Sequence, residues 1–356
     1  ANTVMAKLAS RSVHVFTVIP TLATRLQEAL PNVKVVNVDH GDNLTARYLK
    51  KVNEEDVAAL QEAEVLLGDS HLLQQIKPEH LSKMRWVQST WVGMEHFIES
   101  FRDKDPPPYP ITRMGGDNLT TMMGEYVTGR IILHERDWLT VHNNQMNGVW
   151  DWSGKSNAFR TLADLTVGIL GVGSIGKTVA HNLSVFGSRI HGLVRSQPTP
   201  ESASPCIQKH WLTHELPLLL GECDYLVNLM PSTPSTRGML GGNVLSACKK
   251  CPVLINLGRG DIINEADIVG ALDAGWLSAA HLDVFDVEPL PQDSLLWKHP
   301  KVFITPHAGT WSRAQEVVPF FCQNYERFIN GQQLINEVDF KRGYLNAYMK
   351  TKCNYP

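Results

Sequence analysis

The chain has 356 residues, a length that suggests two or three domains, each large enough to bury its own core. Its composition, 43% hydrophobic and 19% charged, excludes a disordered or fibrous chain, and no stretch approaches 18 consecutive apolar residues. The formal net charge of −3 gives no support for a polyanion-binding surface. We therefore expect no nucleic acid and no membrane as partners, but a small molecule or another protein.

The six cysteines are few for this length and irregularly spaced, which argues against a disulfide framework. Cys248 and Cys251 form a lone C-x-x-C without the second ligand pair that a structural zinc site needs, so we predict no metal. Reduced thiols and the lack of a secretory signal predict a cytoplasmic protein. The first acidic residue is Glu28, and this acid-poor start faintly resembles a transit peptide, which leaves a mitochondrial location open.

From residue 13 the sequence alternates short apolar runs with helical spacing. We expect strands at residues 13–19, 33–38, 65–67 and 86–88, with helices at 22–30 and 56–64. Such alternation predicts βαβ units and a parallel sheet. The proline-rich residues 105–110 end this series, because proline cannot lie inside a helix, and we expect the chain to cross to a second domain there.

A second alternating series follows a predicted long helix at residues 119–134 and a polar, tryptophan-bearing segment, residues 138–159, with little periodicity. Its strands are expected at residues 165–170, 189–193, 225–229, 253–256, 279–282 and 302–305, and its helices at 175–186, 244–248, 265–274 and 312–330. The chain is thus predicted to be α/β, with parallel sheets flanked by helices.

The strand at residues 165–170 runs directly into a G-x-G-x-x-G sequence that opens a helix, the context of a dinucleotide-binding turn. Gly171 would allow the tight turn, Gly173 the approach of a pyrophosphate, and Gly176 close packing of helix on strand. The phosphates would bind the free N–H groups at the helix N-terminus. The alternative is an ordinary glycine-rich turn between a strand and a helix.

The end of the next strand bears on which dinucleotide binds. An NAD site usually places an acid about 20 residues after the glycines, to hold the ribose 2′-hydroxyl. Val194 stands there instead, Arg195 and Ser196 follow, and no acid occurs until Glu201. Because guanidinium binds phosphate with paired hydrogen bonds, we predict NADP(H) as the preferred cofactor, with NAD(H) still open. The alternative is that Arg195 is a solvated loop cation.

Three segments after later strands carry residues suited to reducing a keto acid. Arg259 could clamp a carboxylate and polarise the adjacent carbonyl, and His307 could transfer the proton that accompanies a hydride. Glu288, hydrogen-bonded to that histidine, would favour the imidazolium and fix the ring. Ligands bind outside the carboxyl ends of strands in such sheets, so all three should lie on the cofactor's side.

With these motifs in view, the sequence resembles the D-2-hydroxyacid dehydrogenases, and most their glyoxylate/hydroxypyruvate reductase A-type branch. The likeness covers nearly the whole chain and rests on residues 171–176, 227–236 (VNLMPSTPST), 256–260 (NLGRG), 280–291 (AHLDVFDVEPLP), 294–300 (SLLWKHP) and 305–307 (TPH). It implies two Rossmann-like domains, with the cofactor domain inserted into a discontinuous one. The substrate-binding domain would be residues 1–113 and 313–356, and the NADP-binding domain residues 114–312.

The resemblance also implies roles for single residues. His307 would protonate the keto oxygen, Glu288 would pair with it, and Arg259 would hold the substrate carboxylate and carbonyl. Asp283 matches the family's contact to the nicotinamide carboxamide. The other expected cofactor contacts are Ser174 and Ile175 at the pyrophosphate, Pro231 and Thr236 beneath the adenosine and phosphates, and Leu257, His307 and Gly309 at the strand ends.

The family also binds the substrate carboxylate on an N-terminal loop, which matches residues 89–95 here. Val92 and Gly93 would offer backbone N–H groups. Trp91 departs from the family, which usually has a small residue there. A bulky indole would narrow the site and suit glyoxylate or hydroxypyruvate, although Trp91 could equally pack away from the pocket. Trp311 is a second candidate wall.

Several alternatives remain beside this one. Glu288 argues against formate dehydrogenase, and the chain has no length for the regulatory domain of many phosphoglycerate dehydrogenases. A dinucleotide-sensing corepressor would keep the same Arg, Glu and His, but the missing acid before Arg195 disfavours it. A dehydrogenase for a larger 2-keto acid also stays open. The resemblance implies a homodimer that meets through residues 119–134 and 138–159.

Overall fold

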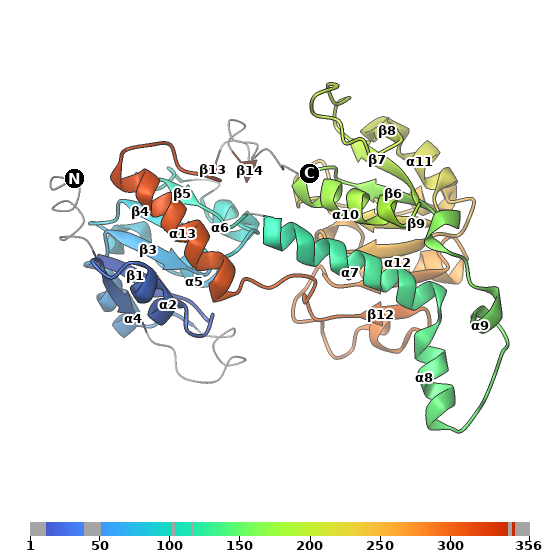
Figure 1. The fold of residues 1–356 in the computed structure, drawn as a ribbon. Helices are drawn as coiled ribbons and strands as arrows, with labels where there is room; N and C mark the ends of the chain where they lie inside the picture. The colour runs from blue at the N-terminus through green and yellow to red at the C-terminus, as the bar shows by residue number, and fades with distance from the viewer. Residues whose placement is uncertain (1–11, 39–50, 102–103, 116, 341–343, 346–356) are drawn as a thin grey trace. The chain divides into compact units, whose positions relative to one another are not determined.

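The computed structural model describes residues 12–38, 51–101, 104–115, 117–340 and 344–345. The chain divides into two compact units (Figure 1). The first unit comprises Ala1–Asp117 together with Ser312–Pro356, and the second unit is Asn118–Trp311. The second unit is therefore inserted into the first.

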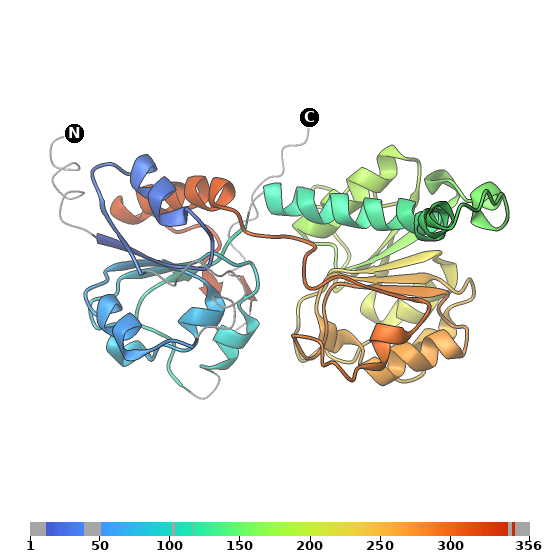
Figure 2. The ribbon, with the colours of Figure 1, turned by 90° about the horizontal axis from the view of Figure 1, so that it is seen from below.

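The first unit is built on a five-stranded sheet in which all strands are parallel. The order is β2 (Lys34–Asn37), β1 (Ser12–Phe16), β3 (Val65–Gly68), β4 (Trp86–Ser89) and β5 (Ile111–Thr112). Strands β3 and β4 are buried along their whole length, as expected for the interior of a sheet covered on both faces. Helices α2 (Leu22–Ala29) and α13 (Ala314–Ile329) cover one face, and α4 (Glu54–Leu60), α5 (Ser70–Leu73) and α6 (Glu95–Glu99) the other (Figure 2).

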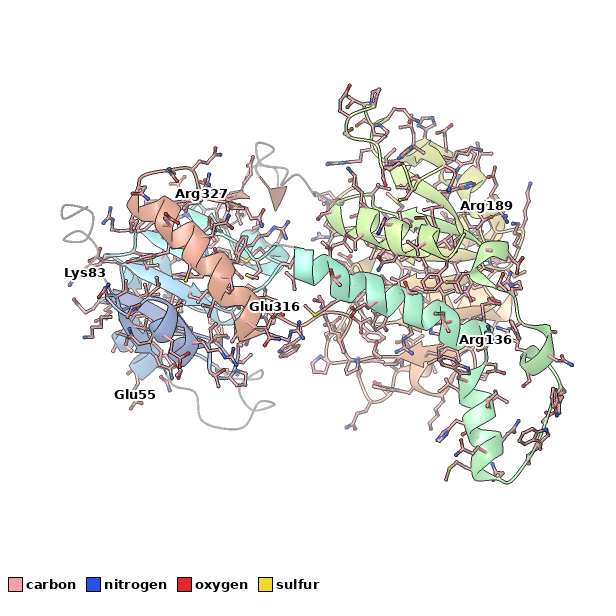
Figure 3. The ribbon with its side chains drawn as sticks, viewed as in Figure 1. Glu55, Lys83, Arg136, Arg189, Glu316 and Arg327 are labelled. Carbon is pink, nitrogen blue, oxygen red and sulfur yellow. The ribbon has the colours of Figure 1, made fainter. Side chains whose placement is uncertain are left out.

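Helix α13 brings the C-terminal piece of the chain into the core of the first unit. The ring of Phe321 stacks on Trp86 of β4, with centroids 5.1 Å apart. Asn324, also buried, donates a 3.0 Å hydrogen bond to Gln88. Glu316 near the start of this helix and Arg327 near its end complement the helix dipole (Figure 3).

The second unit contains a seven-stranded, all-parallel sheet. Its order is β12 (Val302–Ile304), β11 (Ala279–Leu282), β10 (Val253–Asn256), β9 (Tyr225–Asn228), β6 (Thr166–Leu170), β7 (Arg189–Val194) and β8 (Lys209–Leu212). Helices α7 (Asp117–Glu135) and α10 (Ser174–Val185) pack with one set of strand side chains, and α11 (Leu216–Glu222) and α12 (Glu265–Asp273) with the other. The strand order reverses between β6 and β9, where dinucleotide folds bind their ligand.

These two sheets confirm the predicted α/β class. The remaining strands, β13 (Val338–Asp339) and β14 (Tyr344–Leu345), form a small antiparallel pair. The helix expected at residues 244–248 is a 3-10 helix, Val244–Ala247. Strand β8 and helix α11 were not expected.

The segment of residues 138–159 is more ordered than its weak periodicity suggested. It contains α8 (Trp138–Met146) and α9 (Lys155–Ala158), neither of which buries a residue. Its apolar side chains are exposed instead, Trp150 by 86% and Trp152 by 67%. A helix without a buried face has no apolar stripe, which explains why its periodicity is weak. None of the described helices is long and apolar enough to cross a membrane.

Candidate active site

The turn after β6 has the geometry that a phosphate-binding glycine motif requires. Gly171 has a φ of 100°, and a Cβ placed there would lie 3.0 Å from Cγ of Met230. A Cβ on Gly176 would lie 2.4 Å from the carbonyl oxygen of Gly171. Both positions therefore need glycine, one for its backbone conformation and one for close packing.

Gly173 differs from these two because a Cβ there would meet nothing within 4 Å. It is the N-cap of α10, and no side chain caps that helix end. The N–H groups of Ser174 and Ile175, in the first turn, thus face an open approach with the positive end of the helix dipole. These features fit a dinucleotide pyrophosphate, as the sequence predicted.

The residues expected to select the dinucleotide follow β7, next to the glycine turn. Leu193 of β7 pairs with Leu170, the last residue of β6. Arg195 and Ser196 come just after the strand and are exposed, and Arg195 makes no hydrogen bond or ion pair with the described residues. The guanidinium is therefore available to a ligand at this strand end.

Pro231 and Thr236 lie in the loop after β9. The Thr236 hydroxyl donates to the carbonyl of Pro231 at 2.7 Å and accepts from the N–H of Thr233 at 2.9 Å. This hydroxyl therefore holds the turn itself, and a contact of the loop with the nucleotide stays a prediction.

Two buried asparagines hold the loop that carries Arg259. Asn228 and Asn256, the last residues of β9 and β10, share a 2.8 Å hydrogen bond between their side chains. Asn256 also donates to the carbonyl of Arg259 at 3.2 Å, and Nη1 of Arg259 donates to the carbonyl of Gly258 at 2.7 Å. Neither asparagine is among the predicted site residues, although an amide at the end of an otherwise apolar strand was a usable signal.

Glu288 and His307 come from different loops of the second unit and meet directly. Nδ1 of His307 and Oε2 of Glu288 are 2.8 Å apart, and the N–H of Phe285 donates to Oε1 at 2.9 Å. The histidine side chain is 46% exposed. Because Nδ1 is engaged by the carboxylate, Nε2 is the nitrogen left for a substrate.

The charge state of Glu288 follows from its surroundings. Burial alone would raise the pKa of this carboxyl, but the hydrogen bond and the charge of His307 lower it. The N–H of Phe285 and the charge of Arg259 act in the same direction, so the pKa of Glu288 lies below its usual value. The carboxylate is ionised at neutral pH, so it accepts a hydrogen bond from the N–H at Nδ1.

Asp283 organises the backbone around His307. It is buried, and its oxygens accept hydrogen bonds from the Thr305 hydroxyl at 2.5 Å and from the N–H groups of Ala308 and Gly309 at 2.8 and 2.9 Å. Its carbonyl also accepts from the N–H of His307, whose φ of 50° is unusual for a residue other than glycine. The expected contact of Asp283 with a carboxamide stays a prediction beside this positioning role.

Leu257 and Gly309, expected at the cofactor, pack against each other. A Cβ on Gly309 would lie 2.4 Å from Cδ2 of Leu257 and 2.9 Å from Oδ2 of Asp283. Leu257 is buried. Glycine at this position thus lets the loop of His307 approach the end of β10.

The loop after β4, in the first unit, exposes backbone donors. The carbonyl of Val92 accepts from Nη1 of Arg113 at 2.9 Å, and that of Gly93 from the hydroxyl of Ser70 at 3.2 Å. The N–H groups of Val92 and Gly93 have no hydrogen-bond partner among the described residues. They are therefore free to donate, and the binding of a substrate carboxylate there stays a prediction.

The two candidate wall residues are both partly exposed. The Trp91 ring stacks on His71 of α5, with centroids 4.8 Å apart and planes 28° apart. Trp311 is 42% exposed. Whether either side chain limits the size of a substrate stays a prediction.

The cysteines and possible metal ligands give no further site in the described part of the chain. Cys206, Cys223, Cys248, Cys251 and Cys322 are free thiols, and Cys353 lies outside the described residues. No cluster of three or more His, Cys, Asp or Glu side chains that could hold a metal occurs among the described residues.

The fold is shared with several solved 2-hydroxyacid dehydrogenases. A D-isomer specific 2-hydroxyacid dehydrogenase family protein from Aeromonas salmonicida is 29% identical, with a TM-score of 0.80 over 93% of this chain and 99% of that one. An NADPH-dependent glyoxylate/hydroxypyruvate reductase from Sinorhizobium meliloti, in complex with NADP and sulfate, is 27% identical, with a TM-score of 0.77 over 94% and 100%. A D-isomer specific 2-hydroxyacid dehydrogenase from Xanthobacter autotrophicus, in complex with NADPH, is 27% identical, with a TM-score of 0.78 over 94% of this chain and 100% of that one.

The sequence itself carries the signature of the same family. Residues 128–309, just over half of the chain, match the D-isomer specific 2-hydroxyacid dehydrogenase NAD binding domain. This match spans the glycine turn and all three segments that carry Arg259, Glu288 and His307. The family predicted from the sequence is thus confirmed, and the chain belongs to the D-isomer specific 2-hydroxyacid dehydrogenases, a family of NAD(P)-dependent oxidoreductases.

Proposed function

We propose that this enzyme uses NADPH to reduce small 2-keto acids, glyoxylate and hydroxypyruvate, to 2-hydroxy acids. The observation that carries this proposal is the 2.8 Å hydrogen bond between His307 and Glu288, on the sheet that also carries the glycine turn. A bound nicotinamide nucleotide supplies the hydride. The second unit would hold the cofactor, and the first unit, residues 1–117 with 312–356, would bind substrate.

His307 acts as the proton donor to the keto oxygen. The ionised Glu288 accepts a hydrogen bond from Nδ1, which fixes the ring. The second proton is then on Nε2, the nitrogen free to face the substrate. When hydride reaches the keto carbon, charge develops on the oxygen, and Nε2 neutralises it by donating its proton.

Arg259 binds the substrate carboxylate and polarises the carbonyl. The paired asparagines and the bond to Gly258 restrict its loop before substrate arrives. Such preorganisation matters because a guanidinium recognises a carboxylate through two parallel hydrogen bonds of fixed geometry.

The preference for NADPH rests on Arg195 and Ser196. An exposed guanidinium and hydroxyl at the end of β7 suit a 2′-phosphate, and no acid stands there to hold a free 2′-hydroxyl. The S. meliloti reductase is named NADPH-dependent, which supports the same choice here. NAD(H) is the weaker cofactor in this proposal.

The small size of the substrate rests on Trp91. Val92 and Gly93 would bind the carboxylate, and the indole would narrow the space beside them. Replacing Trp91 by Ala should raise kcat/KM about fivefold for a longer 2-keto acid, a modest gain typical of a changed pocket volume. If kcat/KM for the longer acid does not change, the ring lies away from the pocket and serves only to stack on His71.

The exposed apolar side chains of α8 and of residues 149–159 favour a homodimer through this segment. Exposed apolar side chains that gather in one segment, as Trp150 and Trp152 do here, often mark a protein interface. Sedimentation of the wild type against Trp150→Ser, an 86% exposed position, would test it, since the variant should dissociate at higher concentration.

One assay tests the function as a whole. Oxidation of NADPH and of NADH would be measured with glyoxylate, hydroxypyruvate, pyruvate and longer 2-keto acids. We expect NADPH with glyoxylate or hydroxypyruvate to give the highest kcat/KM, and His307→Ala to abolish turnover while the cofactor still binds. An NADH preference would contradict the role of Arg195, and no turnover with any keto acid would favour a dinucleotide-sensing corepressor instead.

A further inference from the structure

A buried carboxylate lies at the carboxyl end of the first sheet, where neither the family motifs nor the proposed mechanism uses it. Asp69 directly follows β3 and is fully buried. Its oxygens accept hydrogen bonds from the Thr17 hydroxyl at 2.7 Å, from the N–H of Val18 at 2.6 Å, and from the hydroxyl of Thr90. One side chain thus joins the residues that follow β1, β3 and β4.

The next residue, Ser70, holds the far end of the same loop. Its hydroxyl donates to the carbonyl of Gly93. The N–H of Thr90 also bonds the carbonyl of Gly68, at 2.9 Å. The residues at the end of β3 and just after it are therefore hydrogen-bonded to the loop at both of its ends, at Thr90 and at Gly93.

These hydrogen bonds determine which backbone groups of the loop after β4 are left for a ligand. Arg113 and Ser70 occupy the carbonyls of Val92 and Gly93, while the N–H groups of these two residues remain without partners among the described residues. Two amides can bind one carboxylate only if both point to the same place, and errors of a fraction of an ångström are costly. A rigid brace beneath Thr90 supplies that constraint.

Burying a carboxylate costs free energy of folding, so its use here to hold a loop needs a reason. Among the described residues Asp69 has no cationic partner, and burial raises its pKa to about 6, although its three hydrogen bonds lower it. Packing alone would be served by an apolar side chain at lower cost. A charged acceptor makes stronger and more directional bonds than a neutral one, as a fixed loop requires.

We propose that Asp69 is a positioning residue for the substrate, because it fixes the loop whose Val92 and Gly93 amides bind the 2-keto acid carboxylate. This inference rests on the proposed function of that loop. Asp69 does not touch the substrate, so its loss should weaken substrate binding more than it slows the chemical step.

The test compares Asp69→Asn with Asp56→Asn. The amide of the first variant would turn a donor toward the Val18 N–H or toward the threonine hydroxyls. Asp56 is also a buried acid of the first unit, but it belongs to the N-terminal capping box of α4. We expect Asp69→Asn to raise KM for glyoxylate at least tenfold, with a smaller change in kcat and KM for NADPH within twofold. Asp56→Asn should leave all three constants unchanged.

Hydrogen exchange gives a readout that does not depend on turnover. The amides of Thr90 and Trp91 are hydrogen-bonded, to Gly68 and to the Ser89 hydroxyl. They should exchange about tenfold faster in Asp69→Asn and at the wild-type rate in Asp56→Asn. If Asp69→Asn does not fold, Ser70→Ala decides, since it removes only the bond to Gly93 and should raise KM in the same direction by a smaller factor.

The outcomes separate this inference from the proposed function. A folded Asp69→Asn enzyme with unchanged KM and unchanged exchange overturns the positioning role, even if the wild type reduces glyoxylate. A fall in kcat with KM unchanged also overturns it. If the wild type reduces another 2-keto acid and not glyoxylate, the substrate assignment fails, and KM for the acid it does reduce tests Asp69.

Discussion

The two units carry their polar residues at the same place, the carboxyl ends of parallel strands, but in opposite states. In the second unit the groups proposed to meet a ligand are exposed, with His307 bonded to an ionised Glu288 and Arg195 open to solvent, while Asp283, which holds the backbone of His307, is buried. In the first unit they are buried, and Asp69 and Thr90 bond each other beneath the loop whose Val92 and Gly93 N–H groups have no hydrogen-bond partner among the described residues. The second unit therefore offers side-chain charge to a ligand, and the first offers a rigid backbone.

This contrast predicts how each edge responds to mutation. A half-exposed catalytic group adds little to folding, so its loss should cost activity and leave stability almost unchanged. A buried polar brace contributes to both, so its loss should change binding and stability together. The variants below would sharpen or break that distinction.

The largest effect is expected for His307→Asn. Asparagine tolerates the left-handed backbone of this position but cannot donate a catalytic proton, so kcat/KM should fall about a thousandfold with the thermal midpoint nearly unchanged. Turnover, thermal unfolding and NADPH fluorescence would be measured together. A variant that keeps a tenth of the activity would remove His307 from the mechanism.

The glycine turn offers a matched pair. Gly176→Ala would force a methyl group to 2.4 Å from a backbone oxygen, so we expect it to lower stability and to lose nucleotide binding. Gly173→Ala meets no protein atom within 4 Å, so it should keep the stability and lose only affinity for the nucleotide. Titration with NADPH and thermal unfolding separate the two. Equal nucleotide affinity for Gly173→Ala and wild type would count against a phosphate at this turn.

Arg195→Ala should raise KM for NADPH about thirtyfold, because it removes a charge-assisted hydrogen bond to the 2′-phosphate. KM for NADH should stay nearly unchanged, because NADH lacks that phosphate. Arg189→Ala is the control because Arg189 begins the same strand at its opposite end, where Figure 3 labels it. It bonds Thr166 and the Asp164 carbonyl. An equal rise in KM for NADPH and for NADH in Arg195→Ala would show that this residue does not recognise the 2′-phosphate.

The smallest effect concerns pH and Asp69. The pKa of Asp69 in the folded protein is about 6, above the ordinary 3.8, so the folded state binds this proton more tightly than the unfolded state. The stabilisation that comes from this proton is complete below pH 3.8 and is lost as the pH rises through 6. Between pH 7 and pH 5 the wild type should gain roughly 1 kcal/mol of unfolding free energy relative to Asp69→Asn, which cannot ionise. Denaturant unfolding at the two values checks this. A constant difference would mean that Asp69 does not titrate in this range.

The sequence predicted the alternation of strands and helices, the glycine turn and the family, because each rests on local spacing or on rare motifs. It could not predict which side chains hold the candidate residues in place. Asn228 meets Asn256 and Asp69 meets Thr90 only after the sheets form, and nothing local in the sequence records such pairs. Helix α8 was not predicted for a different reason: it has no buried face, so its sequence carries no helical spacing of apolar residues.

The stacking of Phe321 on Trp86 has a consequence for the order in which the protein is finished. The strands of the first sheet are synthesised early, but α13, which packs on Trp86, comes only after the second unit, and Asn324 bonds Gln88 across 236 residues of sequence. The second unit is complete at Trp311, before that helix leaves the ribosome. Domains usually mature in the order of the chain, but here the inserted unit can finish first. A chain cut short just before α13 would hold a complete second unit together with a first sheet on which α2 alone covers one face.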